Sequence, residues 1–413
     1  MSPTPSPSSS SVTTNQSSSN STPTLPPINP ASAATSSSCD MFNLYHLWIS
    51  LLFASTKDLV AASASADKLV KEESRTTLLL PSENRTGTTA VIQQHRASPS
   101  CPALNPKLNY RPVVGILSHP GDGASGRLNN DSNASYIAAS YVKFVESAGA
   151  RVIPLIYNEP LDVLEEKLSL VNGVLFTGGW AKNGLYYDRV ATVFQKVLEK
   201  NDAGDHFPLV AICLGFELLT MIISKDKNIL EQFSAGDQAS TLQFMENIKL
   251  QGTVFQRFPP DLLKKLSTDC LVMQNHHYGI SPETFRKNSD LCNFFEILTT
   301  SEDEDNKVYV STVKAHHYPI TAFQWHPEKN AFEWGLSRIP HSEDAIQVTQ
   351  YVANFFISEV RKSLNRPPTR KVLDNLIYNF TPTYCGRAGR GYDEVYIFAR
   401  PSMRECSSVK CKY

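Results

Sequence analysis

The stretch that decides the fold runs from Pro208 to Glu217 and reads Pro-Leu-Val-Ala-Ile-Cys-Leu-Gly-Phe-Glu. Its first five residues form a short apolar run, which is typical of a strand buried on both faces of a parallel sheet. A second apolar run, Leu218–Ile223, follows and predicts a helix. A strand that leads into a helix through Cys213 predicts an α/β fold with a reactive side chain at the carboxyl end of a strand.

The residues around Cys213 have the spacing of a nucleophile elbow. Ala211 and Gly215 stand two residues before and two residues after it, and only small neighbours let so sharp a turn close. An elbow exposes the thiol at a helix N-terminus, where the helix dipole lowers the thiol pKa and the backbone N–H of Leu214 faces an oxyanion beside the sulfur. The structural alternative is a cysteine that fills an apolar core. The strand–turn–helix context favours the nucleophile.

The chain around this elbow alternates between predicted strands and predicted helices. Continuous apolar runs predict buried strands, and apolar residues at helical spacing predict the helices between them. This order predicts an α/β fold, a three-layer sandwich with a central, mostly parallel sheet that binds ligands near the carboxyl ends of its strands. The predicted strands are 112–118, 151–156, 173–176 and 208–212, and the predicted helices are 134–148, 161–168 and 189–198.

A second polar group follows another apolar strand, which begins at Ile320. This run ends in His326, and Glu328 follows two residues later. A cysteine nucleophile needs a base that takes its proton, and the base needs a third group that fixes its tautomer. Pro327 stiffens the turn, so the carboxylate can fold back toward the imidazole. Cys213, His326 and Glu328 are therefore the candidate catalytic residues.

The overall composition excludes several classes of partner. The chain has 413 residues, 41% of them hydrophobic, which is enough for one large core or two smaller ones. Its 39 Lys and Arg residues nearly balance 40 Asp and Glu residues, so the net charge of -1 offers no basic surface for nucleic acid or an anionic membrane. No run approaches the roughly 18 to 20 apolar residues of a membrane-spanning helix. The eight cysteines include no CxxC pair with zinc-ligand spacing.

The N-terminal quarter differs from the rest of the chain. Residues 1–40 are rich in Ser, Thr and Pro, carry Asp40 as their one charged residue, and predict a disordered extension. Residues 41–66 combine a short apolar run with Ala-x-Ala sites, which predicts a secretory signal peptide, and residues 67–108 then predict a linker or arm. We interpret Met41 as the working start and residues 1–40 as an over-extended gene model. The alternative is a disordered tail that precedes a buried apolar segment.

Entry into the secretory pathway would affect asparagine and cysteine residues. The acceptor sequence Asn-x-Ser/Thr then predicts a glycoprotein. Cleavage after Ala66 would leave seven cysteines, of which the nucleophile must stay reduced, and the other six allow 15 pairings. Those of the C-terminal tail either staple the tail to the domain or remain free. The acceptors after residue 66 are Asn84, Asn130, Asn133 and Asn379, and the tail cysteines are Cys385, Cys406 and Cys411.

Several motifs together resemble a known family. The Cys-Leu-Gly elbow, a Gly-Gly pair after the preceding strand and the His-Pro-Glu sequence are similar to class I glutamine amidotransferases. Longer stretches resemble the plant members of the γ-glutamyl hydrolase family, and this resemblance covers roughly residues 110 to 400. Ala211 departs from the amidotransferase pattern, which usually has Gly there, and we expect a slightly adjusted turn. The longer stretches are Arg111–Pro120, Cys213–Glu217, Asn275–Tyr278, Gln324–Glu328, Asp374–Tyr378 and Tyr392–Tyr396.

The resemblance implies roles for individual residues. It implies a catalytic domain over 109–363, a C-terminal tail over 364–413 that packs on it, a homodimer, and no metal or organic cofactor. His277 in the Asn-x-His motif is the implied substrate-site histidine, although a solvent-facing turn would also explain it. Lys182, near the Gly-Gly pair, is a candidate for binding substrate carboxylates. The implied catalytic residues are Cys213, His326 and Glu328, and the implied oxyanion donors are Gly178, Gly179 and Leu214.

The implied activity is that of a cysteine peptidase, an omega peptidase. It hydrolyses the γ-glutamyl bonds of folate polyglutamates through a thioester on Cys213, and the plant relatives imply a vacuolar or secreted protein. An acidic vacuole would suit a thiol of low pKa. The alternative is a glutaminase-type amidotransferase subunit that releases ammonia from glutamine, although the residues after 364 are too few for a synthase domain. A non-catalytic binding protein with this fold would be expected to have lost a catalytic residue.

Overall fold

The computed structural model describes residues 103–123, 134–386 and 392–399. The predicted extension over 1–40, the signal peptide over 41–66 and most of the arm over 67–108 lie outside the described residues. So do the glycosylation acceptors Asn84, Asn130 and Asn133.

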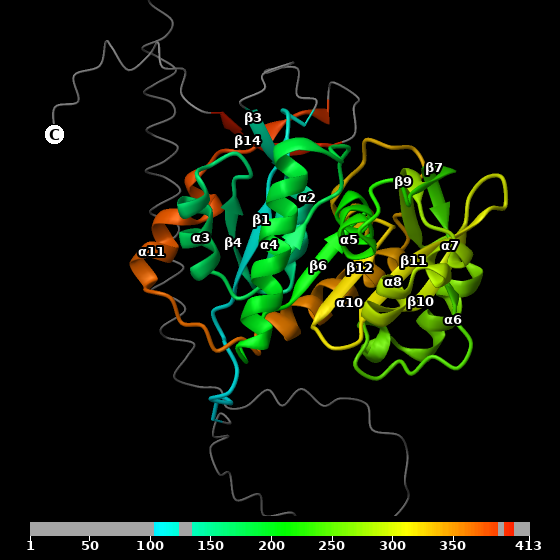
Figure 1. The fold of residues 1–413 in the computed structure, drawn as a ribbon, viewed down its shortest axis with the longest axis horizontal. Helices are drawn as coiled ribbons and strands as arrows, with labels where there is room; N and C mark the ends of the chain where they lie inside the picture. Colours follow the sequence, from blue (N-terminus) through cyan, green and yellow to red (C-terminus); the bar gives the residue numbers. More distant parts are fainter. Residues whose placement is uncertain (1–102, 124–133, 387–391, 400–413) are drawn as a thin grey trace, which may run out of the picture. The chain divides into compact units, whose positions relative to one another are not determined.

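An eight-stranded sheet forms the centre of the fold (Figure 1). The ladders that join its first five strands are parallel, and the ladders that join the last three strands to it are antiparallel. The predicted central, mostly parallel sheet is therefore confirmed. In spatial order the strands are β4 (Arg151–Leu155), β1 (Val113–Leu117), β5 (Val174–Phe176), β6 (Leu209–Ile212), β12 (Ile320–Phe323), β11 (Val308–Ala315), β10 (Phe295–Glu302) and β8 (Gln243–Phe244).

Helices cover both faces of the sheet and bury its alternate side chains. Val113 and Leu117 of β1 pack in one core cluster, whereas Val114 and Ile116 pack in another, because successive side chains of a strand point to opposite faces. The first cluster contains side chains of α3 (Leu161–Ser169), α4 (Gly184–Asp202), α5 (Leu214–Ser224) and α11 (Thr369–Asn375). The second contains side chains of α2 (Ala139–Ser147), α6 (Pro260–Thr268) and α10 (Glu343–Val360). This arrangement confirms the three-layer sandwich.

Several smaller elements complete the fold. β7 (Glu231–Ser240) and β9 (Val272–Gly279) pair as an antiparallel ribbon, and four short strands form a second antiparallel sheet. These strands are β13 (Thr383–Tyr384), β14 (Glu394–Ala399), β3 (Ala134–Ala138) and β2 (His119–Pro120). The remaining elements are α7 (Pro282–Lys287), α8 (Ser289–Phe294), α9 (Lys329–Phe332), η1 (Val254–Arg257) and η2 (Ile377–Asn379).

The helix predicted over 134–148 is wrong at its start. Residues Ala134–Ala138 form strand β3, and the helix begins only at Ala139. β3 pairs with β14, a segment about 260 positions later in the chain, along the register Val395↔Ala138 to Ala399↔Ala134. Pairing with a distant segment overrides the local helical pattern, which a single stretch of sequence cannot show.

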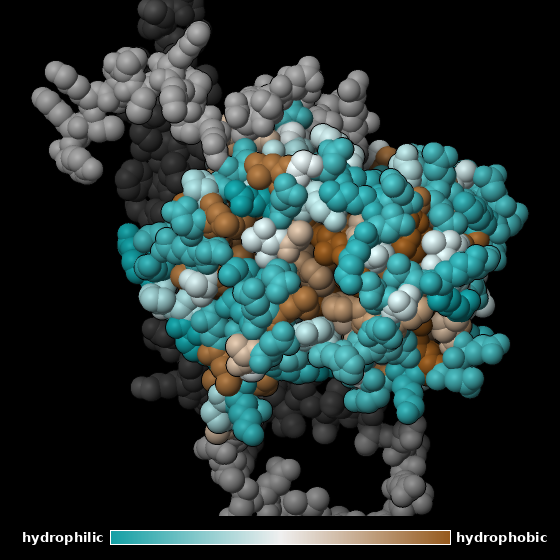
Figure 2. Space-filling model, viewed as in Figure 1, coloured by the Kyte–Doolittle hydropathy of each residue, from teal (hydrophilic) through white to brown (hydrophobic). Residues whose placement is uncertain are grey.

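The surface drawn in Figure 2 is dominated by hydrophilic side chains, which separate the apolar groups into small areas. Within residues 103–123, 134–386 and 392–399, no helix is long and apolar enough to cross a membrane.

Candidate active site

Cys213 occupies the predicted elbow between β6 and α5. Its φ of 52° and ψ of -106° lie in a region that residues other than glycine rarely adopt. The backbone N–H of Cys213 donates to the carbonyl of Phe323 at 2.7 Å, and its own carbonyl accepts from the N–H of Glu217 at 3.0 Å. The strained turn is therefore bonded on both sides, which is the structure that a nucleophile elbow requires.

The thiol of Cys213 is buried beside charged groups. Only 4% of the residue is exposed, and its Sγ lies 3.9 Å from the carbonyl oxygen of Asn275. Burial raises the pKa of the thiol, and the carboxylates of Glu217 and Glu328 raise it further, against the opposing effects of Lys182 and the Leu214 N–H. The predicted lowering of the thiol pKa is therefore wrong, because the thiol is buried and faces two carboxylates. A neutral thiol must lose its proton during attack, so the site needs a base.

His326 and Glu328 have the geometry expected of a base and its orienting group. His326 lies just after β12, and its Nδ1 is 2.7 Å from Oε1 of Glu328. Both side chains are buried, and Nε2 of His326 has no hydrogen-bond partner. Because the carboxylate accepts the Nδ1–H, the lone pair of the neutral ring is on Nε2.

The surroundings of this pair favour a neutral imidazole on His326 and an ionised carboxylate on Glu328. Burial lowers the pKa of His326, although the Glu328 carboxylate works against this effect. Burial alone would raise the pKa of Glu328, but His326 and Lys329 outweigh it and hold the pKa below its ordinary value. A neutral imidazole beside an ionised carboxylate is the resting state that a general base needs.

Gly178, the first glycine after β5, lies next to the side chains of both Cys213 and His326. A Cβ on Gly178 would lie 2.9 Å from Cε1 of His326 and 3.4 Å from Cβ of Cys213. The nucleophile and the base therefore flank the same glycine. A Cβ on Gly179, whose φ is +154°, would lie 2.3 Å from the ring of His119, so glycine is required there.

His119 holds this loop in place. Its Nε2 accepts hydrogen bonds from the N–H groups of Trp180 and Ala181 at 3.0 and 3.1 Å, and its Nδ1–H donates to the Pro120 carbonyl. Burial lowers the pKa of His119 to about 4, which keeps the ring neutral and able to accept both bonds. Sequence reasoning included His119 in a motif but gave it no role.

The predicted oxyanion donors have different surroundings. The N–H of Leu214 begins α5 next to the thiol, as expected. The N–H of Gly178 already donates to the hydroxyl of Tyr141 at 2.9 Å, so it is engaged in this structure. The donor role of Gly179 stays a prediction. Tyr141, which is buried on α2, was not identified from the sequence.

His276 and His277 occupy opposite faces of β9. His276 is buried, its Nδ1–H donates to the carbonyl of Tyr278 at 2.9 Å, and burial lowers its pKa to about 3. His277 is exposed and lines an open depression of about 480 Å³ together with Phe233 and Lys307. His277 is therefore the accessible histidine of the pair.

Lys182 forms an ion pair beside the thiol. Its Nζ lies 2.8 Å from Oε2 of Glu217, and the ammonium also lies 4.7 Å from the ring centre of Tyr278. The other oxygen of Glu217 accepts from Nε2 of Gln324 at 3.3 Å. Glu217 was part of a quoted motif, but its pairing with a distant lysine carries no local sequence signal.

Comparison with known proteins identifies the family. The family model described as Peptidase C26 matches residues 112–328, which include all three predicted catalytic residues. Gamma-glutamyl hydrolase 1 of Arabidopsis thaliana is 66% identical over 336 residues, which are 81% of this chain and 94% of the relative. The chain belongs to the γ-glutamyl hydrolase family.

Two further comparisons are with a second plant relative and with a solved structure. Gamma-glutamyl hydrolase 2 of Arabidopsis thaliana is 65% identical over 342 residues, which are 83% of this chain and 96% of that relative. Among solved structures, a glutamine amidotransferase from Thermotoga maritima aligns with a TM-score of 0.34 and 13% identity, over 61% of this chain and 99% of that chain.

In this member of the γ-glutamyl hydrolase family, a segment beyond the matched region also reaches the site. Lys329, the residue after the catalytic carboxylate, is buried, and its Nζ lies 4.9 Å from the ring centre of Tyr392. The N–H of Asp393 donates to Glu333 at 2.7 Å, and the Asp393 carboxylate accepts from the N–H of Trp334 at 2.6 Å. The C-terminal segment is thus fastened to the chain just after the catalytic pair.

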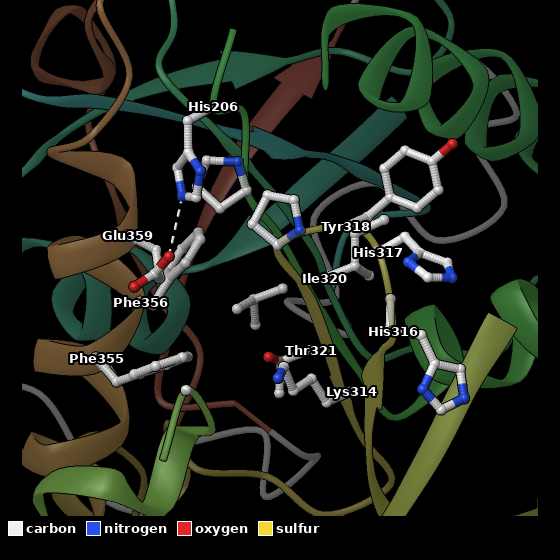
Figure 3. A pocket seen from close by; sticks show the side chains of 15 residues that line it. His206, Lys314, His316, His317, Tyr318, Ile320, Thr321, Phe355, Phe356 and Glu359 are labelled. Atoms are coloured by element: carbon white, nitrogen blue, oxygen red, sulfur yellow. Dashed lines mark hydrogen bonds and ion pairs between the residues drawn. The ribbon is translucent and has the colours of Figure 1, made fainter. Parts of the chain in front are cut away.

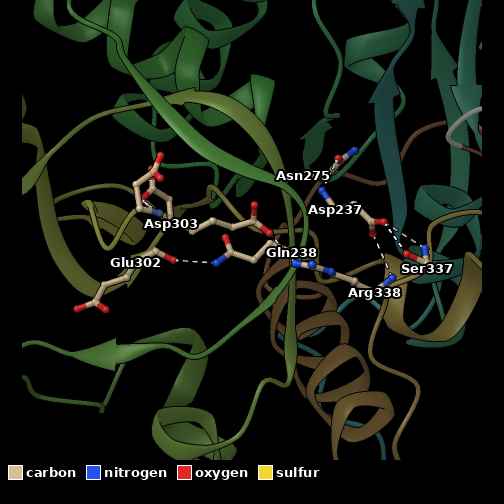
Figure 4. Close-up of polar contacts among 9 residues, drawn as sticks. Asp237, Gln238, Asn275, Glu302, Asp303, Ser337 and Arg338 are labelled. Carbon is tan, nitrogen blue, oxygen red and sulfur yellow. Dashed lines mark hydrogen bonds and ion pairs between the residues drawn. The ribbon is translucent and has the colours of Figure 1, made fainter.

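The β7–β9 ribbon is tied to the same region (Figure 4). The N–H of Asp237, at a φ of 45°, donates to Oδ1 of Asn275, whose carbonyl contacts the thiol. The carboxylate of Asp237 accepts from both the N–H and the hydroxyl of Ser337 and from the N–H of Arg338. These bonds fix the wall of the site that Asn275 provides.

Another cavity, of about 250 Å³, is separate from this site (Figure 3). It is lined by residues at the starts of β6 and β12, such as Pro208 and Ile320, and by the His206–Glu359 pair, whose atoms are 2.9 Å apart. Cys213 follows the opposite end of β6, so this cavity does not belong to the catalytic edge of the sheet. In the part of the chain that the structure describes, no cluster of three or more His, Cys, Asp or Glu side chains could hold a metal ion.

We expect iodoacetamide to alkylate Cys213 at a rate that keeps rising with pH beyond pH 9, because its thiol pKa is raised and little thiolate exists below that pH. Peptide mass spectrometry can follow the Cys213 peptide, with the exposed Cys270 as a reference in the same sample. A Cys213 rate that levels off below pH 7 would reveal a preformed thiolate and contradict this expectation.

Proposed function

We propose that the protein is a cysteine-type γ-glutamyl hydrolase that shortens folate polyglutamates by cleaving their γ-glutamyl bonds. The observation that carries this proposal is the strained Cys213 elbow beside a buried His326–Glu328 pair with 2.7 Å between its atoms. A glutamyl γ-amide presents a carbonyl carbon that such a thiol can attack. The activity of the plant relatives, as their names state it, agrees with this chemistry.

The first half of the reaction forms a thioester. Sγ of Cys213 attacks the γ-carbonyl carbon while its proton passes to Nε2 of His326. The oxyanion faces the N–H of Leu214, and the Glu328 carboxylate stabilises the imidazolium. The imidazolium then gives its proton to the amide nitrogen, the C–N bond breaks, and a shorter glutamate chain leaves as an amine.

The second half of the reaction restores the enzyme. Nε2 of His326 takes a proton from water as the water oxygen attacks the thioester carbon. The C–S bond breaks, the imidazolium returns its proton to the sulfur of Cys213, and the product leaves with a new γ-carboxylate. We propose that His277, at the open depression, contacts the substrate during both halves.

The burial of His326 bears on the working pH. A lowered imidazole pKa keeps the base form populated in more acidic solution than an exposed histidine would allow. We therefore propose that the protein works in an acidic compartment, which it reaches through the signal peptide over 41–66. This proposal rests on the lowered pKa of the His326 imidazole. The thiol of Cys213 gives no support for an acidic compartment, because its pKa is raised. A homodimer likewise stays a proposal.

Product analysis tests the function. Wild-type and Cys213→Ala proteins are incubated with a folate pentaglutamate, and free glutamine is supplied in a parallel tube. We expect mass spectrometry to show chain shortening by wild type alone and no ammonia from glutamine. Ammonia from glutamine with an intact pentaglutamate would instead establish the glutaminase alternative.

Replacing Glu328 by Gln removes the charge that stabilises the imidazolium but keeps the side-chain volume. We expect kcat to fall by roughly 10²- to 10⁴-fold, the range that acid–base catalysis contributes. Since Glu328 raises the pKa of His326, its loss moves the acidic limb of the kcat/KM profile to lower pH. The exposed Glu296→Gln variant is the control. An unchanged kcat, or a limb that moves to higher pH, would argue against the assigned role.

A further inference from the structure

A buried ion pair lies next to the thiol but outside the catalytic group. Glu217 is one helical turn after Cys213 on α5, and its side chain is 3% exposed. Residues four apart lie on the same face of a helix, so the carboxylate is on the side of the nucleophile. Lys182 comes from the segment after the Gly178–Gly179 loop, and its side chain is 26% exposed. The lysine side chain is therefore partly exposed, whereas the Glu217 side chain is buried.

The ammonium lies near Glu217 on one side and near a side chain of the open depression on the other. Its Nζ is 2.8 Å from Glu217 on the buried side and 4.7 Å from the ring centre of Tyr278 on the other side. Tyr278 lines the depression together with His277. The charge of Lys182 also lowers the pKa of Cys213, which agrees with this position. A substrate that extends from the thiol toward Tyr278 would lie near this ammonium.

The chemistry of the two candidate substrates differs at the α-carbon, which is separated from the γ-carbonyl carbon by three bonds of about 1.5 Å each. A glutamyl unit within a folate polyglutamate has a free α-carboxylate, but its α-nitrogen is a neutral amide. Free glutamine has the same carboxylate and a cationic α-ammonium. A buried carboxylate such as Glu217, if unpaired, would attract the ammonium and repel the α-carboxylate.

Building on the proposed function, we propose that Lys182 determines specificity for the glutamyl unit that is cleaved. Its ammonium binds the α-carboxylate of that unit. By pairing with Glu217 it also neutralises the group that would attract an α-ammonium, so an acylated γ-glutamyl unit is preferred over free glutamine. This pair explains why a site with the chemistry of a glutaminase acts on γ-glutamyl chains.

The test compares wild type with Lys182→Met, which removes the charge, and Lys182→Arg, which keeps it. The substrates are pteroyl-di-γ-glutamate and its analogue with an α-carboxamide on the cleaved unit. We expect Lys182→Met to lower kcat/KM for the carboxylate substrate by roughly 10- to 100-fold, mainly through KM, since a charged hydrogen bond is lost. The carboxamide analogue should lose less than about threefold, and Lys182→Arg should recover most of the activity.

Two control variants keep the outcomes distinct. Lys225→Met removes a remote, exposed lysine and should change neither rate. Lys182→Met alone leaves the buried Glu217 carboxylate unpaired and should lower thermal stability. The double variant Lys182→Met/Glu217→Gln removes both charges, so it should recover that stability without recovering the preference for the α-carboxylate. An equal loss on both substrates would overturn the inference, because a merely structural lysine would produce it. Failure of wild type to cleave any γ-glutamyl substrate would overturn the proposed function itself.

Discussion

The site depends on one backbone constraint, the left-handed conformation of Cys213 between β6 and α5. A non-glycine residue in such a region costs on the order of 1–3 kcal/mol, so the surrounding structure must enforce it. The Phe323 carbonyl of the neighbouring strand β12 bonds the Cys213 N–H. On the other side Gly215 lies so close to β5 that a Cβ there would be 2.9 Å from the Phe176 carbonyl oxygen. The same neighbouring strand, β12, leads directly to His326, so the constraint that strains the nucleophile also places its base.

Burial determines which groups are charged in the resting site. It favours the neutral form of an isolated group, so the thiol of Cys213 keeps its proton, and its pKa is raised. Glu328 stays ionised because His326 and Lys329 lie near it. Burial raises the pKa of Glu217, although Lys182 pairs with it and works against this effect. A neutral thiol has to give up its proton when it attacks a carbonyl carbon, which makes the nearby His326 the candidate acceptor.

The sequence was sufficient for the features that depend on local pattern. Apolar runs predicted the parallel strands, small residues around Cys213 predicted the elbow, and the spacing of His326 and Glu328 predicted their pairing. The predictions that the structure contradicts concern contacts between distant segments and the effect of burial on a pKa. The start of α2 was misplaced because β14 captures residues 134–138 as a strand. The thiol pKa shifts in the opposite direction to the prediction. The sequence around Cys213 shows neither that its thiol is buried nor that the carboxylate of Glu328 lies near it. The roles of Tyr141, Glu217 and Tyr392 required the three-dimensional structure for the same reason.

The central claim is that Cys213 carries the acyl group during turnover. Wild-type protein mixed with pteroyl-di-γ-glutamate, quenched with acid within the first turnover and digested at low pH, should yield the Cys213 peptide with a pteroylglutamyl mass attached through an alkali-labile thioester. The label should disappear in step with product formation. Product formation in the first turnover with no label on this peptide, or with the label on a different residue, would contradict the account.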